Sequence, residues 1–190
     1  MSGADRHYHT AHHLALLWQR HRRFSAAMPA LHTAETDHLI ACAITFHDAI
    51  YEPRQGGNEA ASAALWRQVA THAARPADEI DWVSATIEAT ANHLGTIINP
   101  RCARDHARLW VLDLDLTPIG ETPEQFGRNT ALLRAEFAHL DDAAWDRSRL
   151  AFLGSLAAYP KLYRCAPITD AFEAQARENI ARELAAVSRS

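Results

Sequence analysis

Leu39 to Tyr51 read LIACAITFHDAIY, a largely apolar run that ends in an adjacent imidazole and carboxylate, His47 and Asp48. Burying either group without a partner is costly, and a carboxylate in apolar surroundings tends to protonate. The pair therefore needs a polar or ionic neighbour, and a divalent metal is one such neighbour. A His-Asp pair on its own is more often a helix cap or a local hydrogen-bonding pair, so the rest of the chain has to decide between these interpretations.

Length and composition predict one folded domain over residues 1–190. The chain is long enough for a single substantial core, and its 48% apolar and 22% charged residues exclude a disordered or membrane composition. No apolar stretch approaches the roughly 20 residues that a membrane helix needs, and the polar first ten residues lack the apolar core of a signal peptide. We expect a cytoplasmic protein with no membrane partner.

Charge and cysteine content exclude two further classes of protein. The net charge is −4 and the arginines are interspersed with acidic residues, which argues against a nucleic-acid partner. The three cysteines are far apart and form no CxxC motif, so neither a disulfide framework nor a thiolate zinc site is indicated. Twelve histidines are many for this length and are the compositional hint of metal chemistry.

Hydrophobic periodicity and helix-start signals predict an all-α fold of about eight helices. Asn58 is an expected N-cap, Thr122 and Gln125 are an expected capping box, and Asp141 is expected to begin the seventh helix. Apolar residues alternate with aspartates in 111–116, which also suits a strand, although we expect a helix there. The expected helices span residues 5–24, 34–48, 59–73, 77–94, 101–116, 123–139, 141–159 and 170–187.

Ionisable side chains interrupt the expected core at four places. In the first expected helix, His9 and His13 are four residues apart and therefore lie on one face. Each place alone also suits a helix cap or a side chain that faces water. Together, imidazoles and carboxylates suit a divalent ion such as Mn, Fe, Co, Ni, Zn or Mg, and helical bundles build metal sites from inward-pointing ligands. The four places are His9 with His13, His47 with Asp48, His93, and Asp113 with Asp115.

The order of these residues resembles the HD superfamily of metal-dependent phosphohydrolases, which is all-helical and is named for its His-Asp doublet. More closely, it resembles a small bacterial branch known as predicted HD phosphohydrolases. The resemblance implies an HD-domain-like helical bundle with a metal site between the first five helices, which holds one or two divalent ions. The matching segments are Arg6 to Thr10 (RHYHT), His13, Phe46 to Tyr51 (FHDAIY), Asn58-Glu59 with Ser62, and Asp113 to Leu116 (DLDL) with Gly120.

The resemblance implies four metal ligands, which are His13, His47, Asp48 and Asp115. His13 is preferred to His12 because the family's ligand follows the histidine of the Tyr-His pair by four residues. Asp115 is preferred to Asp113 because the family's ligand usually stands directly before a leucine and after a small or apolar residue. His12 and Asp113 stay open as the alternatives.

The same resemblance implies hydrolysis of a phosphate ester or nucleotide by a water that the metal activates. His9 resembles the histidine that protonates the leaving oxygen in the related cyclic-nucleotide phosphodiesterases. Glu59 and His93 stand where the superfamily often has groups that orient water or extend the site to a second metal. Arg6 and Arg54 are the nearest candidates to bind the phosphate, because a guanidinium grips phosphate oxygens in bidentate fashion.

Two other functions fit the same helical fold. A di-iron oxygenase would need more histidine ligands, for which His93 with His72 or His106 is the candidate set. A non-catalytic sensor would retain the metal or the pocket and bind a nucleotide without turnover.

The N-terminal region bears on oligomeric state. Members of the resembled branch usually have a further helix before the Arg-x-Tyr-His segment, whereas this chain begins a few residues ahead of it. Two explanations stay open, a truncated start or a first ligand helix that packs differently here, and either can leave exposed apolar surface that a second copy of the chain covers in a homodimer.

Overall fold

A computed structural model describes residues 6–187, and in this range it contains α-helices and short 3-10 segments but no strand. The expected all-α fold of about eight helices is confirmed for this part of the chain. The α-helices are α1 (Ala11–Phe24), α2 (Ala34–Phe46), α3 (Asn58–His72), α4 (Ala77–Ala89), α5 (Ala103–Leu116), α6 (Pro123–Glu136), α7 (Asp142–Ala157) and α8 (Ala166–Val187). The 3-10 segments are η1 (Ser25–Ala27), η2 (Pro29–Leu31), η3 (Thr90–Asn92) and η4 (Thr117–Gly120).

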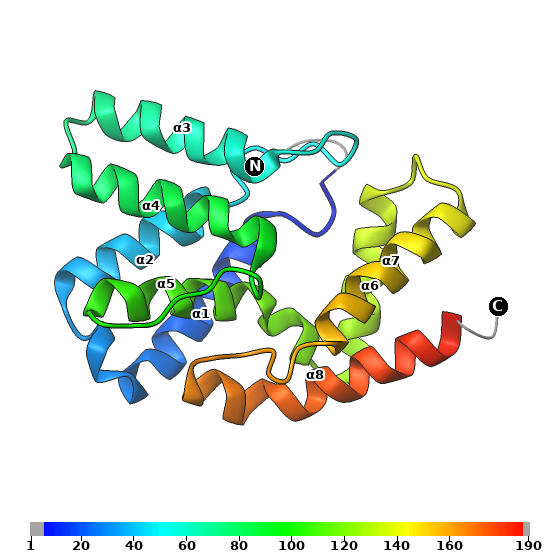
Figure 1. The fold of residues 1–190 in the computed structure, drawn as a ribbon. Coiled ribbons are helices and arrows are strands. Elements are labelled where there is room, and N and C mark those ends of the chain that lie inside the picture. Colours follow the sequence, from blue (N-terminus) through cyan, green and yellow to red (C-terminus); the bar gives the residue numbers. More distant parts are fainter. Residues whose placement is uncertain (1–5, 188–190) are drawn as a thin grey trace.

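Helix α5 is the central element of the core. It packs against α1, α2 and α4, as Figure 1 shows, and it buries the side chains of most of its last eight residues. The fully buried Trp110 donates its indole N–H to His21 Nδ1 of α1 at 3.0 Å, and His21 Nε2 donates in turn to Asp37 of α2 at 2.8 Å. These two hydrogen bonds connect α5 to α1 and α1 to α2 inside the core.

The loop between α2 and α3 is closed by its own polar side chains. Ser62 of α3 bonds both the N–H and the carbonyl of Ile50 at 3.0 Å. The expectation that Asn58 is the N-cap of α3 is wrong, because Gly57 holds that position with a left-handed backbone, φ 84°. A glycine adopts this conformation without steric cost. Asn58 instead donates to the carbonyl of Glu52 and accepts from its N–H.

Several helix boundaries near the site differ from the expectation. Helix α2 ends at Phe46 rather than at residue 48, so that His47 is its C-cap, and α6 ends at Glu136 rather than at residue 139. Helix α1 begins at Ala11, where the side chain of Thr10 accepts the N–H of His12 and so caps the helix, while the expected start at Asp5 lies outside the described residues. His9 therefore precedes the helix, and the prediction that it shares a helix face with His13 is wrong. Helix α4 ends at Ala89, so His93 lies in a turn after η3 rather than on a helix.

Helices α6 and α7 begin with side-chain caps. Thr122 Oγ1 accepts the N–H of Gln125 at 3.3 Å, but the Gln125 side chain bonds Asn129, so the second half of the expected capping box does not form. Asp141 caps α7 as expected and accepts the N–H of Ala144 at 2.7 Å.

Helix α8 begins at Ala166 rather than at the expected Asp170. Glu173 of α8 accepts the N–H groups of Leu162 and Tyr163. It therefore fastens the segment that leads into the helix. Asn179 of α8 donates to the carbonyls of Ile119 and Glu121 at 2.8 Å and ties α8 to η4.

The α6–α7 pair stands apart from the α3–α4 pair, with the segment before α1 between them (Figure 1). Arg149 of α7 donates to Glu183 of α8 at 2.6 Å, and this ion pair holds α7 on α8. The arrangement leaves room for a cavity between α6–α7 and the ends of α1, α2 and α5.

A second, shallower apolar groove lies between α1 and α2. It is lined by Leu14, Ala15, Trp18, Ala41, Ile44 and Thr45. This groove is the kind of surface that the expected homodimer would cover, and the homodimer stays a prediction. Among the described helices none is both long and apolar enough to span a membrane.

Candidate metal centre

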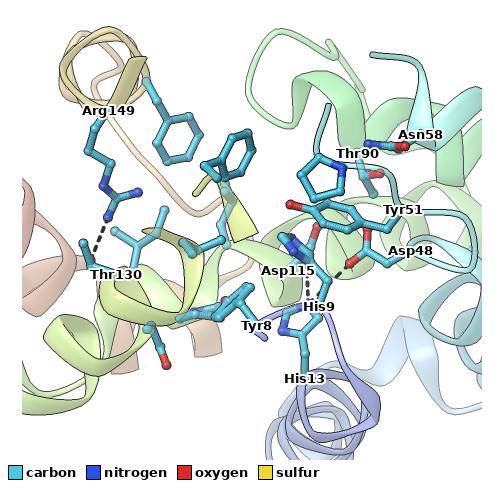
Figure 2. A pocket seen from close by; sticks show the side chains of 18 of the residues that line it. Tyr8, His9, His13, Asp48, Tyr51, Asn58, Thr90, Asp115, Thr130 and Arg149 are labelled. Carbon is cyan, nitrogen blue, oxygen red and sulfur yellow. Dashed lines mark hydrogen bonds and ion pairs between the residues drawn. The ribbon is translucent and has the colours of Figure 1, made fainter. Parts of the chain in front are cut away.

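The four ligands that the resemblance implies lie together in the structure, although up to 102 residues separate them. Asp115 Oδ1 lies 3.1 Å from His13 Nε2 and 3.4 Å from His47 Nε2. Asp48 Oδ2 lies 2.9 Å from His47 Nε2 and 4.0 Å from His13 Nε2. Figure 2 shows His13, Asp48 and Asp115 on one side of a cavity. Helix α1, the end of α2 and the end of α5 thus contribute to one cluster.

The ring of His47 is oriented so that its Nε2 points at two carboxylates. Its Nδ1 lies 2.9 Å from the carbonyl oxygen of Ile44, which can only accept, so Nδ1 carries the proton. In the neutral ring Nε2 then has a lone pair. This nitrogen is buried and forms no hydrogen bond of proper geometry, although Asp48 and Asp115 are close to it. Two carboxylates this close to Nε2 require a positive charge there, either a proton on Nε2 or a metal ion that takes the place of that proton.

The electrostatics of the cluster are those of a cation site. Burial disfavours the charged ring of His47, but Asp48 and Asp115 outweigh burial and raise its pKa well above the usual value. Burial likewise disfavours the charged carboxylate of Asp115, yet His47 and the bonds from His13 and His93 hold its pKa well below the usual value. Two imidazole nitrogens and two carboxylates fit a borderline or hard divalent ion. The residues present therefore fit the metal that the resemblance implies.

His93 supports the cluster from the turn after η3. Its Nε2 lies 2.7 Å from Asp115 Oδ2, the oxygen that the other two histidines do not approach. Asp115 thus has one oxygen held by His93 and the other directed at His13 and His47. A partner of this kind fixes the orientation of a metal-binding carboxylate.

The alternatives His12 and Asp113 lie elsewhere. His12 is exposed on the first turn of α1. Asp113 is fully buried and accepts the N–H groups of Arg164 and Cys165 at 2.6 and 2.7 Å. Burial raises the pKa of Asp113 despite these hydrogen bonds. Asp113 therefore fastens the segment that leads into α8, and the geometry favours Asp115 and His13 as ligands.

His9 is held by a carboxylate that sequence analysis did not identify, Glu136. His9 Nδ1 lies 2.7 Å from Glu136 Oε2, and the His9 ring stacks on Tyr51 with 4.0 Å between centroids. Glu136 Oε1 accepts the backbone N–H groups of His7, Tyr8 and His9. No local pattern marks this residue, because it stands 127 residues from His9 at the end of α6.

Glu136 is ionised at neutral pH. Burial alone would favour the neutral acid, but the bonds from His9 and from the backbone N–H groups outweigh burial and lower its pKa to about 2. An ionised carboxylate can only accept, so Nδ1 of His9 carries a proton. Nε2 is then the nitrogen through which His9 can exchange a proton with a molecule in the cavity.

The other three predicted site residues differ in their surroundings. Glu59, in the first turn of α3, lines the cavity. Arg6 donates to the carbonyls of Asp48 and Ala49 at 2.8 and 3.1 Å, so it holds the loop that follows the His-Asp pair and does not line the cavity. Arg54 is exposed in the loop before α3 and does not line the cavity either.

The cavity beside the cluster has a volume of about 500 Å³. It extends from His13, Asp48 and Asp115 to the facing sides of α6 and α7, where Figure 2 shows Thr130 and Arg149. Sites for small molecules in proteins commonly have volumes of roughly 300 to 1,000 Å³. The cavity is therefore large enough for a small-molecule ligand.

One other group of potential ligands occurs among the described residues, His38, Cys42 and Glu79. It already holds a positive charge, because Arg75 Nη2 lies 2.7 Å from both His38 Nε2 and Glu79 Oε2. A metal would have to displace this guanidinium. The buried cluster at His47 is therefore the better candidate.

Comparisons of the chain with protein-family models, with curated proteins and with solved structures gave no match. The fold and the site by themselves define an all-helical protein with a buried cluster of imidazoles and carboxylates beside a cavity. The relation to the HD superfamily stays a resemblance that the quoted motifs carry.

Proposed function

We propose that this chain is a metal-dependent phosphohydrolase that acts on a phosphate ester or a nucleotide. The observation that carries the proposal is the buried cluster of His13, His47, Asp48 and Asp115 at the end of a cavity. The order of these residues in the sequence supports a hydrolase of the HD type. The ligand set suits Mn, Fe, Co, Ni, Zn or Mg, as one ion or two.

A divalent ion at these ligands would lower the pKa of a water molecule and withdraw charge from a phosphoryl oxygen. Hydrogen bonds within the protein already fix the orientation of two of these ligands. The Ile44 carbonyl fixes the tautomer of His47, and His93 fixes the carboxylate of Asp115. Such prearranged ligands need little reorganisation when the metal and the substrate bind.

With a proton on Nε2 as well as on Nδ1, His9 is the candidate for the acid that the leaving oxygen needs. When the P–O bond breaks, His9 gives the proton on Nε2 to that oxygen, while Nδ1 stays bonded to Glu136. The buried carboxylate and the stacked Tyr51 hold the ring in one orientation. Glu59 lines the same cavity and is the candidate to orient the attacking water.

Tyr8 is a further donor for the phosphate. Its ring lies 5.2 Å from that of His13, and burial raises the pKa of its hydroxyl, which is therefore protonated at neutral pH. Arg54 stays a candidate for a second contact, because Pro53 and Gln55 on either side of it line the cavity. Arg6 acts on the site through the backbone of Asp48.

The geometry favours a hydrolase over the di-iron oxygenase. Only His93 of the extra histidines lies at the cluster. His106 stands nine residues before Asp115 on α5, which is about 14 Å along the helix axis. His72 is at the opposite end of α3 from Glu59 and is exposed.

Phosphate release tests the proposal. Wild type, His9→Ala and Asp48→Ala are assayed on an aryl phosphate and a nucleotide panel with Mn, Co, Ni or Mg. We expect turnover by wild type, a loss of roughly 100-fold or more in His9→Ala on esters with poor leaving groups, and no turnover by Asp48→Ala. Phosphate release that Asp48→Ala retains would contradict the proposal. Oxygen consumption by an iron-loaded protein without phosphate release would indicate the oxygenase.

A further inference from the structure

Helices α6 and α7 each direct a regular stripe of side chains into the cavity. On α6 and just beyond its end the stripe includes Phe126, Leu133 and Phe137, and on α7 it includes Trp145 and Phe152. Spacings of seven and four residues place these side chains on one face of a helix. Such a stripe usually packs against another element of the protein. Here it lines the cavity opposite the metal centre.

The polar side chains of this wall carry no unpaired charge among the described residues. Arg149 donates to Glu183 at 2.6 Å and to Thr130 at 3.1 Å, and its guanidinium lies over the rings of Phe126 and Phe152 at 5.5 and 5.8 Å. Its charge is therefore matched by Glu183. The wall suits an uncharged, largely apolar group.

The aromatic side chains on this wall favour an aromatic ligand. Phe152 is 43% exposed, a large fraction for an aromatic side chain that borders a cavity. The ring centroids of Phe137 and Trp145 lie 5.8 Å apart, so the two aromatic side chains are neighbours on this wall. Flat ring systems gain from stacked and edge-to-face contacts with such side chains beyond the area that they bury.

We propose that the wall formed by α6 and α7 binds an uncharged aromatic ring system of the substrate while the phosphate lies at the His-Asp cluster. The substrate class is then a phosphate ester whose organic part contains such a ring. This inference rests on the proposed function. The wall itself can be tested without metal and without turnover.

The first test is direct binding of 2-naphthol, an uncharged ring without phosphate, to the metal-free protein by calorimetry. The chain offers a matched pair on α6. Leu133 lines the cavity, whereas its neighbour Leu132 is 40% exposed and does not line it. We expect roughly tenfold weaker binding in Leu133→Ala and in Phe152→Ala and unchanged binding in Leu132→Ala. Circular dichroism checks that each variant is folded.

The second test is phosphate release from 2-naphthylmethyl phosphate and from glycerol phosphate, which have leaving alcohols of similar basicity. We expect a higher kcat/KM for the naphthylmethyl ester, and Phe152→Ala should lower that value roughly tenfold without changing the value for glycerol phosphate. Equal kcat/KM for both esters in wild type would overturn this inference and leave the proposed function standing. Naphthol binding by a protein that hydrolyses neither these esters nor any member of the aryl phosphate and nucleotide panel would overturn the proposed function and leave the aromatic site standing.

The oligomeric state of the protein provides a separate test of the aromatic site on α6 and α7. If wild type does not bind 2-naphthol and Phe152→Ala dissociates a dimer in sedimentation, the wall is covered by a second copy of the chain and the inference is wrong. We expect Phe152→Ala to sediment as wild type does.

Discussion

Replacing Glu136 by glutamine tests how the segment before α1 is held at the site. The side chain is fully buried and binds three backbone N–H groups and His9. Lowering its pKa from 4.5 to about 2 corresponds to about 3 kcal/mol of stability at pH 7. Glutamine keeps an acceptor oxygen but cannot ionise, and its amide N–H₂ group opposes the Nδ1 proton of His9. We therefore expect Glu136→Gln to lower the free energy of unfolding by about 3 kcal/mol.

The pH dependence of this loss has a definite sign. Because the folded pKa lies below the unfolded one, the stabilisation is complete above about pH 5 and disappears as pH falls through 4.5 toward 2. Urea unfolding should give a difference from wild type of about 3 kcal/mol at pH 7 and about 2 kcal/mol at about pH 3.5. Glu178→Gln, an exposed change on α8, is the control and should cost less than about 0.5 kcal/mol.

Two results would contradict this role of Glu136. One is a Glu136→Gln protein as stable as wild type at pH 7, and the other is a difference that stays constant between the two pH values. The variant should also lose kcat on esters with poor leaving groups while it keeps its metal content, since Glu136 orients His9 and does not belong to the metal cluster. A loss of bound metal would place Glu136 in a different role.

Three other substitutions separate the roles of neighbouring groups. His93→Ala should weaken divalent-metal affinity by roughly 10- to 100-fold, measured by calorimetry, because Asp115 loses the partner of its second oxygen; unchanged affinity would contradict this role. Asp113→Asn should destabilise the fold by about 1 to 3 kcal/mol in urea without changing metal stoichiometry, whereas loss of metal would make Asp113 a ligand. Trp18→Glu should make the protein sediment as a monomer if a second copy covers the groove between α1 and α2, and a wild type that is already monomeric refutes the homodimer.

Much of the helical arrangement could be predicted because its signals are local. Asp141 acts through the N–H of a residue three positions away. The helix expected over 101–116 is found as α5, although the alternation of apolar residues with aspartates at its end suited a strand as well. The two wrong helix-cap predictions also have local causes, because in each case a neighbouring residue or side chain formed a different interaction. Gly57 took the cap position from Asn58 because the chain turns there with positive φ, and Gln125 bonded Asn129 rather than closing the capping box.

Part of the candidate site could be predicted from the sequence and part could not. His13, His47, Asp48 and Asp115 could be proposed from a motif order, and the structure brings them within a few ångströms of one another. The roles of Glu136 and of Arg6 could not be predicted. Glu136 acts across 127 residues of chain, and the partners of Arg6 are backbone carbonyls that no sequence pattern identifies.

Titration of metal-free protein with Co²⁺ shows whether the cluster of His13, His47, Asp48 and Asp115 binds a metal ion. The visible spectrum of the bound ion reports its nitrogen and oxygen ligands, and the end point gives the stoichiometry. We predict one or two bound ions in wild type, loss of the spectrum in His47→Ala and Asp115→Asn, and an unchanged spectrum in His38→Ala, which alters the other group of potential ligands. A spectrum that survives in His47→Ala and disappears in His38→Ala would contradict metal binding by this cluster.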